Sequence, residues 1–101
     1  MKNSTERTRP SDALQLHRQE VLDLIRAGGG RNPRVFGSVA RGVDTVDSDL
    51  DILVSVDPEF AWEFVSLSSK LRDLLGVSVD VVSERGLKPK HAGILEAAVP
   101  L

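Results

Sequence analysis

The stretch from Phe36 to Val54, FGSVARGVDTVDSDLDILV, joins a glycine-serine turn and a polar loop to the most hydrophobic strand candidate of the chain. Side chains alternate along residues 49–56 (DLDILVSV), so Asp49 and Asp51 fall on one face of the predicted strand, and the other face takes Leu50, Ile52 and Val54. Aspartate is depleted in strands, and a buried unpaired carboxylate is costly. Two aspartates at the start of such a strand therefore indicate a functional site.

The segments on either side of this stretch predict a small α/β (α+β) domain. We expect a helix over residues 11–27 ended by glycines 28–30, a strand over 34–36, a helical turn over 38–41, a loop over 43–48, a helix over 60–75, a strand over 77–82 and a last helix over 87–98. This order predicts a small sheet with helices packed on it. We expect residues 1–10 to be a disordered lead-in and residues 11–101 to be a single domain.

Composition excludes several classes of protein. The 101 residues include no cysteine, which excludes disulfides and thiolate metal sites, and the two histidines are far apart, which disfavours a zinc site. A net charge of −2 argues against general nucleic-acid binding, and we expect no direct DNA binding. There is no membrane-length apolar run and no apolar stretch near the N-terminus, so we expect a cytoplasmic protein that does not bind membranes.

A third aspartate, Asp80, stands inside the predicted strand over 77–82. If that strand neighbours the one over 49–56, Asp80 would stand about 4.8 Å to the side of the first two carboxylates. Oxygen-only ligands favour Mg²⁺, and two ions about 3.5–4 Å apart could be bridged by Asp49 and Asp51. The alternative is that each aspartate separately caps a loop, pairs with an arginine or faces water. That explanation suits any one aspartate but not three together.

Gly37 and Ser38 follow a strand and open a helical turn, which directs free backbone N–H groups outward and suits a phosphate. Arg41 is placed to reach the same phosphate with its guanidinium group. The alternatives are an ordinary turn and a surface arginine. The lysine and the spacing of a P-loop are absent.

FGSVARG followed by SDLDILV resembles the signature of the minimal nucleotidyltransferase domains of the polymerase-β superfamily, and MntA-like antitoxins in particular. The resemblance continues through VDVVS at residues 79–83 and covers about residues 11–101. It implies the polymerase-β-type nucleotidyltransferase fold, a mixed sheet flanked by helices. It assigns triphosphate binding to Gly37 and Ser38, and Mg²⁺ binding and catalysis to Asp49, Asp51 and Asp80. The chain departs from the family pattern in its triple glycine and in the arginines at 26, 31 and 34.

The resemblance further implies a Mg²⁺-dependent enzyme that moves AMP from ATP to a partner protein, a HEPN-domain RNase toxin of the HepT type. Two other functions stay open: transfer to a small molecule or an RNA end, and a catalytically idle antitoxin that acts by occlusion. Trp62 lies off the apolar stripe of the helix predicted over 60–75, so a core position and a partner contact are both open for it.

Overall fold

A computed structural model describes residues 8–86 and 92–101. Its sheet has four strands in the order β3-β2-β1-β4. The strands are β1 (Gly30–Phe36), β2 (Leu50–Val56), β3 (Val79–Ser83) and β4 (Val99–Pro100). β1 is antiparallel to β2 and β4, whereas β3 is parallel to β2. The sheet is therefore mixed, as the sequence predicted.

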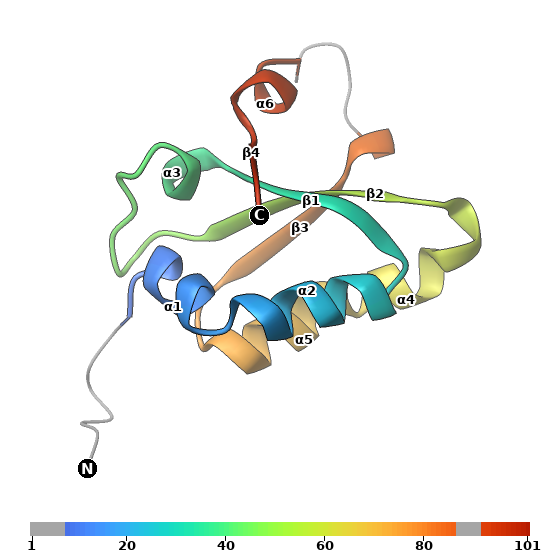
Figure 1. Cartoon of the computed structure of the whole chain (residues 1–101), viewed down its shortest axis with the longest axis horizontal. Helices are drawn as coiled ribbons and strands as arrows, with labels where there is room; N and C mark the ends of the chain where they lie inside the picture. The colour runs from blue at the N-terminus through green and yellow to red at the C-terminus, as the bar shows by residue number, and fades with distance from the viewer. Residues whose placement is uncertain (1–7, 87–91) are drawn as a thin grey trace.

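Helices cover one face of this sheet. Figure 1 shows them together on one side: α1 (Pro10–Leu16), α2 (Arg18–Ala27), α4 (Ala61–Val65) and α5 (Leu67–Leu75). β2 packs against these helices with Leu50, Ile52 and Val54, whose side chains are fully buried. These residues join buried side chains of α2 and α5 in one hydrophobic core. The alternation predicted for β2 is confirmed, and it sends Asp51 to the opposite face, called the second face below.

The predictions of single helices over residues 11–27 and 60–75 are wrong in one respect: each segment forms two consecutive helices. α1 and α2 meet at His17, whose backbone (φ −115°, ψ 25°) leaves the helical region, and α4 and α5 meet at Ser66. The apolar spacing continues across each break, so periodicity alone could not reveal it. The first helix also begins at Pro10, within the segment expected to be a lead-in; residues 1–7 of that segment lie outside the described residues.

The second correction concerns the C-terminal segment. α6 (Ala92–Ala97) lies within the helix predicted over 87–98, of which residues 87–91 lie outside the described residues. The following β4 was not predicted. It adds an edge strand through the pairs Arg34–Pro100 and Val35–Val99, and the Leu101 N–H donates to the Pro33 carbonyl (3.0 Å). Two residues are too short to carry an alternation signal.

The triple glycine has a packing reason at the junction between α2 and β1. α2 ends at Ala27, and Gly29 turns the chain with a φ of +81°. A Cβ atom on Gly29 would overlap the ring of Phe60. Glycine therefore allows both the left-handed turn and the close approach of the aromatic ring. β1 then starts at Gly30, earlier than predicted.

Candidate active site

The structure brings the three predicted aspartates to one end of the sheet, where β1 ends and β2 and β3 begin. Asp51 and Asp80 are paired in the parallel register of β2 and β3, so their Cα atoms are neighbours roughly 4.8 Å apart on the second face. Asp49 directly precedes β2. Asp49 and Asp80 are exposed and Asp51 is half-buried. We call this region the aspartate end.

The carboxylates at the aspartate end repel one another. Burial, followed by the charges of Asp80 and Asp49, raises the pKa of Asp51 above its ordinary value. Within residues 8–86 and 92–101, none of the three takes part in a salt bridge. Among the described residues, negative charge therefore accumulates here without a salt-bridge partner.

This donor set fits a hard divalent cation such as Mg²⁺. It consists of carboxylate oxygens, it is reachable from solvent, and its repulsion is what a cation would relieve. Among the described residues, no three His, Cys, Asp or Glu side chains are already gathered into a metal-binding group. The aspartates thus match the ion in chemistry and placement, and their side chains would have to draw together around it.

The glycine-serine turn lies against the same carboxylates. β1 ends at Phe36, and α3 (Gly37–Ala40) follows at once. Gly37 has a φ of +69°, and a Cβ atom there would overlap the Asp51 carboxylate. Glycine is therefore required at this position both for the left-handed backbone and for the approach of Asp51. Ser38 follows, half-buried, and Arg41 is exposed just beyond α3.

The loop between the turn and β2 is held by a residue that the sequence analysis did not single out. Asp44 is only 6% exposed, and it accepts a hydrogen bond from the Ser11 N–H (2.9 Å) near the N-terminus of α1. Arg9, the residue before α1, provides no side-chain cap, so a carboxylate remote in sequence performs that role. Burial alone would raise the pKa of Asp44, but the hydrogen bonds from Ser11 and from the Asp44 backbone, together with the charge of Arg9, outweigh it and hold this pKa below the ordinary value. A capping partner 33 residues away leaves no local sequence signal.

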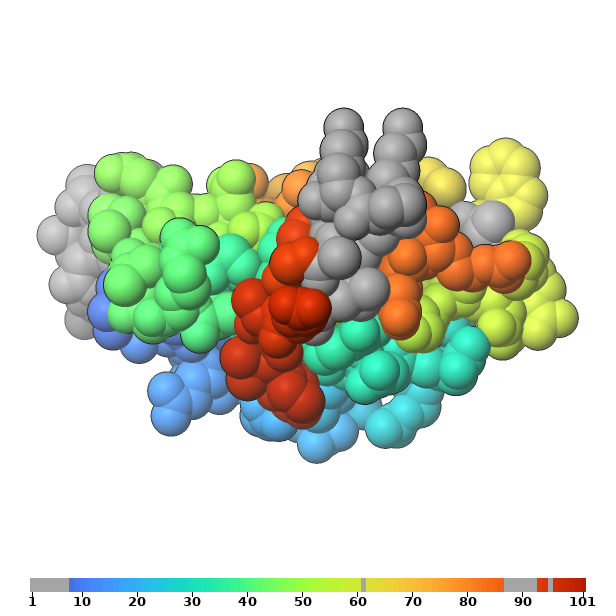
Figure 2. Space-filling model, turned by 90° about the horizontal axis from the view of Figure 1, so that it is seen from above, coloured from blue at the N-terminus to red at the C-terminus, as the bar shows by residue number. Residues whose placement is uncertain are grey.

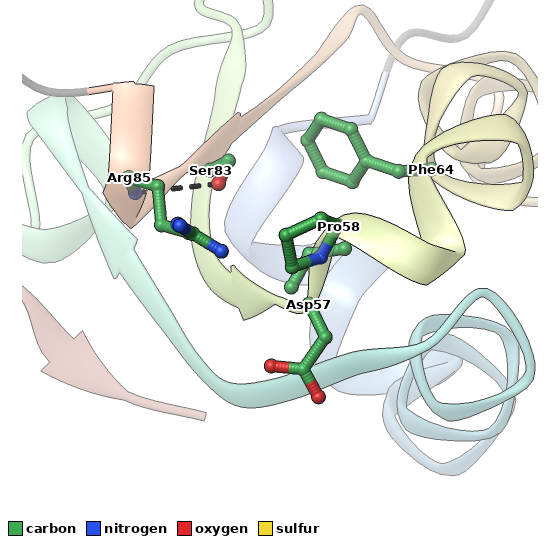
Figure 3. A pocket seen from close by; sticks show the side chains of 6 residues that line it. Asp57, Pro58, Phe64, Ser83 and Arg85 are labelled. Carbon is green, nitrogen blue, oxygen red and sulfur yellow. Dashed lines mark hydrogen bonds between the residues drawn. The ribbon is translucent and has the colours of Figure 1, made fainter.

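Three hollows of the described surface lie at the other end of the sheet, which we call the arginine end, where β1 begins and β2 and β3 end. Another lies beside α1. One hollow of about 250 Å³ has a mainly apolar lining that includes Val56, Pro58 and Phe64. In Figure 3 Phe64 and Pro58 border it on one side and Ser83 and Arg85 on the other, while the Asp57 carboxylate points away. This end holds none of the predicted site residues.

The arginines that depart from the family pattern are engaged with acids away from the aspartate end. Arg31 pairs with Asp57 (2.8 Å), and Arg34 pairs with Glu84 (3.0 Å), which also accepts a hydrogen bond from the Ser55 hydroxyl (2.8 Å). Arg26 lies 3.9 Å from Asp23 on α2. These contacts hold the three arginines away from Gly37 and Asp51.

Comparison with known proteins shows the family of this chain. Residues 15–100 match the nucleotidyltransferase domain family. The chain belongs to that family. This nucleotidyltransferase is 39% identical over 76 residues to the protein adenylyltransferase MntA of Thermococcus cleftensis, with 74% of each chain covered.

Solved structures agree with this membership. A structure described as a minimal nucleotidyltransferase superposes with a TM-score of 0.81 at 42% identity, covering 98% of this chain and all of the other. A toxin-antitoxin structure with AMP-PNP matches at 25% identity and a TM-score of 0.65, covering 81% of this chain and 69% of the other. The nucleotidyltransferase fold and the enzyme class expected from the sequence are therefore confirmed. In the part of the chain that the structure describes, no helix has the length and apolar character needed to span a membrane.

Proposed function

We propose that this nucleotidyltransferase transfers AMP from ATP to a hydroxyl group on a partner protein. The observation that carries the proposal is the aspartate end: Asp51 lies in register beside Asp80, follows Asp49, and is packed against Gly37. The similarity to a protein adenylyltransferase supports ATP as the donor and a protein as the acceptor.

In this proposal each part of the aspartate end has its own task. The N–H groups at Gly37 and Ser38 bind the triphosphate, and Arg41 approaches the leaving phosphates from the exposed side. Asp49, Asp51 and Asp80 would hold Mg²⁺, with two ions as the expected number. The metal would supply positive charge to the phosphates and lower the pKa of the acceptor hydroxyl.

The transfer conserves atoms and charge as follows. The acceptor hydroxyl oxygen attacks the α-phosphorus of ATP and forms the new P–O bond. The bond between the α-phosphorus and the oxygen that bridges to the β-phosphorus breaks, and pyrophosphate leaves with that electron pair. Asp80 is exposed at the rim of the cluster, so it can take the proton from the hydroxyl.

A HEPN-domain toxin is the partner that the family resemblance favours. The MNT antitoxin of Shewanella oneidensis, solved with a tri-AMPylated HEPN toxin, has the same fold (24% identity, TM-score 0.59). For the present chain we propose an antitoxin role in which a HepT-like partner is modified covalently. A cytoplasmic location is part of the same proposal.

Co-expression with the HEPN protein encoded nearest to this gene tests the proposal. The intact mass of that partner should rise by about 329 Da per AMP with the wild-type chain and stay unchanged with Asp51→Asn. Toxicity should return with the variant. An unmodified partner together with continued protection by Asp51→Asn would instead establish an antitoxin that acts by occlusion.

A further inference from the structure

The outer side of α4 exposes two large apolar residues. Trp62 is 86% exposed and Val65 is 72% exposed. They are three residues apart in a helix, so they lie on the same face of it. Phe64, by contrast, is half-buried and packs against the hydrophobic core. We call Trp62 and Val65 the α4 face, together with Glu63 of the same helix and Glu59 of the 3-10 turn (Pro58–Phe60) that precedes it.

The α4 face differs from ordinary protein surface because its tryptophan, Trp62, is exposed to solvent rather than buried. A tryptophan offers a large area for contact at low conformational cost, and such residues dominate the binding energy of protein interfaces. With the core complete beneath α4, burying Trp62 requires another molecule.

The charges beside Trp62 indicate the chemistry of the molecule that would bind there. Glu59 and Glu63 are both exposed, and no salt bridge within residues 8–86 and 92–101 neutralises either of them. Their negative charge disfavours nucleic acid, an anionic membrane and a second α4 face. It favours a basic protein surface, on which an arginine can stack on the indole ring and pair with the glutamates.

The distance between the α4 face and the aspartate end sets the size of a partner that would contact both. Figure 1 shows α4 at the opposite end of the sheet from α3. From Asp51 to Val56, the last residue of β2, the strand spans about 17 Å. A partner that contacts α4 while presenting a hydroxyl to the aspartate end must therefore be a folded protein rather than a metabolite. Figure 2 shows the two regions on opposite sides of the molecule as seen from above, with the green segment that carries α3 at one side and the yellow-green segment that leads into α4 at the other.

We infer that the α4 face is the docking site for the acceptor protein, which binds it with a basic patch whose arginine covers Trp62. This inference rests on the proposed function, since it names the surface that recognises the acceptor. Docking at one end of the sheet and chemistry at the other are separate functions of separate residues.

A photo-crosslinking experiment tests the inference. The catalytically disabled Asp51→Asn chain carries p-benzoylphenylalanine at position 62 or, as a control, at Leu16, which is 77% exposed on α1. The chain is irradiated in its native host, and captured proteins are identified by mass. Each is then purified and incubated with the wild-type chain and labelled ATP. The expected result is one protein that is captured at position 62, not at position 16, and accepts AMP.

The other outcomes separate the two proposals. If an AMP acceptor exists but is not captured at position 62, the docking inference is overturned and the proposed function stands. If the protein captured at position 62 never accepts AMP, the α4 face serves some other partner and the inference is overturned. Capture of nothing at position 62 also overturns it.

Kinetics with the purified acceptor give a second, independent measurement. Trp62→Ser should raise KM for the acceptor about 30-fold, the loss typical of an interface hot spot, while kcat and the affinity for ATP stay unchanged. The pair Glu59→Gln and Glu63→Gln should raise KM less and weaken its salt dependence. Leu16→Ser is the matched control and should change neither. Equal KM values for Trp62→Ser and Leu16→Ser would contradict the inference.

Discussion

The acidic residues in or next to the strands are paired with arginine at one end of the sheet and have no salt bridge among the described residues at the other. At the arginine end, Asp57 and Glu84 each have an arginine partner, and Ser55 adds a hydrogen bond to Glu84. At the aspartate end, Asp49, Asp51 and Asp80 have no salt bridge within the described residues.

The pKa values of Glu84 and Asp51 are shifted in opposite directions, in line with this difference. The hydrogen bonds from Ser55 and Arg34, together with the charge of Arg34, lower the pKa of Glu84, whereas burial and neighbouring aspartates raise the pKa of Asp51. A carboxylate with a lowered pKa adds to stability at neutral pH, and one with a raised pKa subtracts from it. The arginine end therefore serves stability, while the aspartate end retains a repulsion that only a bound cation removes.

The largest expected effect comes from removing one charge at the aspartate end. Asp51→Asn should lower AMP transfer at least about 100-fold, because an amide cannot hold Mg²⁺ as a carboxylate does. The same variant should melt at or above the wild-type temperature without ligand, because it relieves the repulsion. Transfer of labelled AMP and thermal melts measure the two effects. Transfer within tenfold of wild type would remove Asp51 from the metal site.

Binding of Mg²⁺ with ATP should remove the repulsion among the carboxylates that distinguishes the aspartate end from the arginine end. Mg²⁺ with ATP at a hundredfold excess over Kd should stabilise the folded protein by about 2.7 kcal/mol, since it binds only the folded state. Melting curves with Mg²⁺·ATP, with ATP and EDTA, and with neither measure this. Asp51→Asn should lose the shift and Glu84→Gln should keep it. A folded wild-type protein that shows no shift at millimolar ligand would argue strongly against a nucleotide site.

A pair of glycine substitutions sharpens the comparison further. Gly37 and Gly76 have nearly the same φ, +69° and +70°, but a Cβ atom would meet the Asp51 carboxylate at Gly37 and nothing within 4 Å at Gly76. Both alanine variants should lose about 1 kcal/mol from backbone strain. Gly37→Ala should also displace Asp51 and abolish the stabilisation by Mg²⁺·ATP, which Gly76→Ala should retain. Equal ligand shifts in the two variants would contradict this assignment.

The smallest expected effect concerns the loop that joins Gly37 to Asp49. Asp44→Ala should destabilise the protein by about 1 kcal/mol at pH 7, because α1 loses its cap. The pKa of Asp44 in the folded protein is below the ordinary 3.8. The stabilisation that its carboxylate gives is therefore present above pH 3.8 and is lost as the pH falls through the folded-state pKa.

Denaturant unfolding between pH 7 and pH 3 measures the contribution of Asp44. The difference in unfolding free energy between wild type and Asp44→Ala should narrow as the pH falls below 3.8. Asp12→Ala serves as the control, because Asp12 is an exposed partner of Arg9 and its removal should matter little at any pH. A difference that does not change with pH would mean that packing, rather than the carboxylate charge, holds the loop.

The sequence by itself determined the local features of the site. Strand alternation placed Asp49 and Asp51 opposite Leu50 and Ile52, since this period is a property of the extended backbone. The glycine-serine turn was recognisable for a similar reason, because φ values of the kind found at Gly37 exclude most other residues. These features depend on neighbours in the chain, which a sequence displays directly.

Tertiary structure alone decided which distant segments meet. The register that sets Asp80 beside Asp51, the edge strand β4, and the cap that Asp44 gives to α1 join residues 29 or more positions apart. The breaks at His17 and Ser66, and the exposure of Trp62, depend on how helices pack on a finished core. Such contacts follow from which arrangement buries the most apolar surface over the whole chain, and no local pattern encodes that choice.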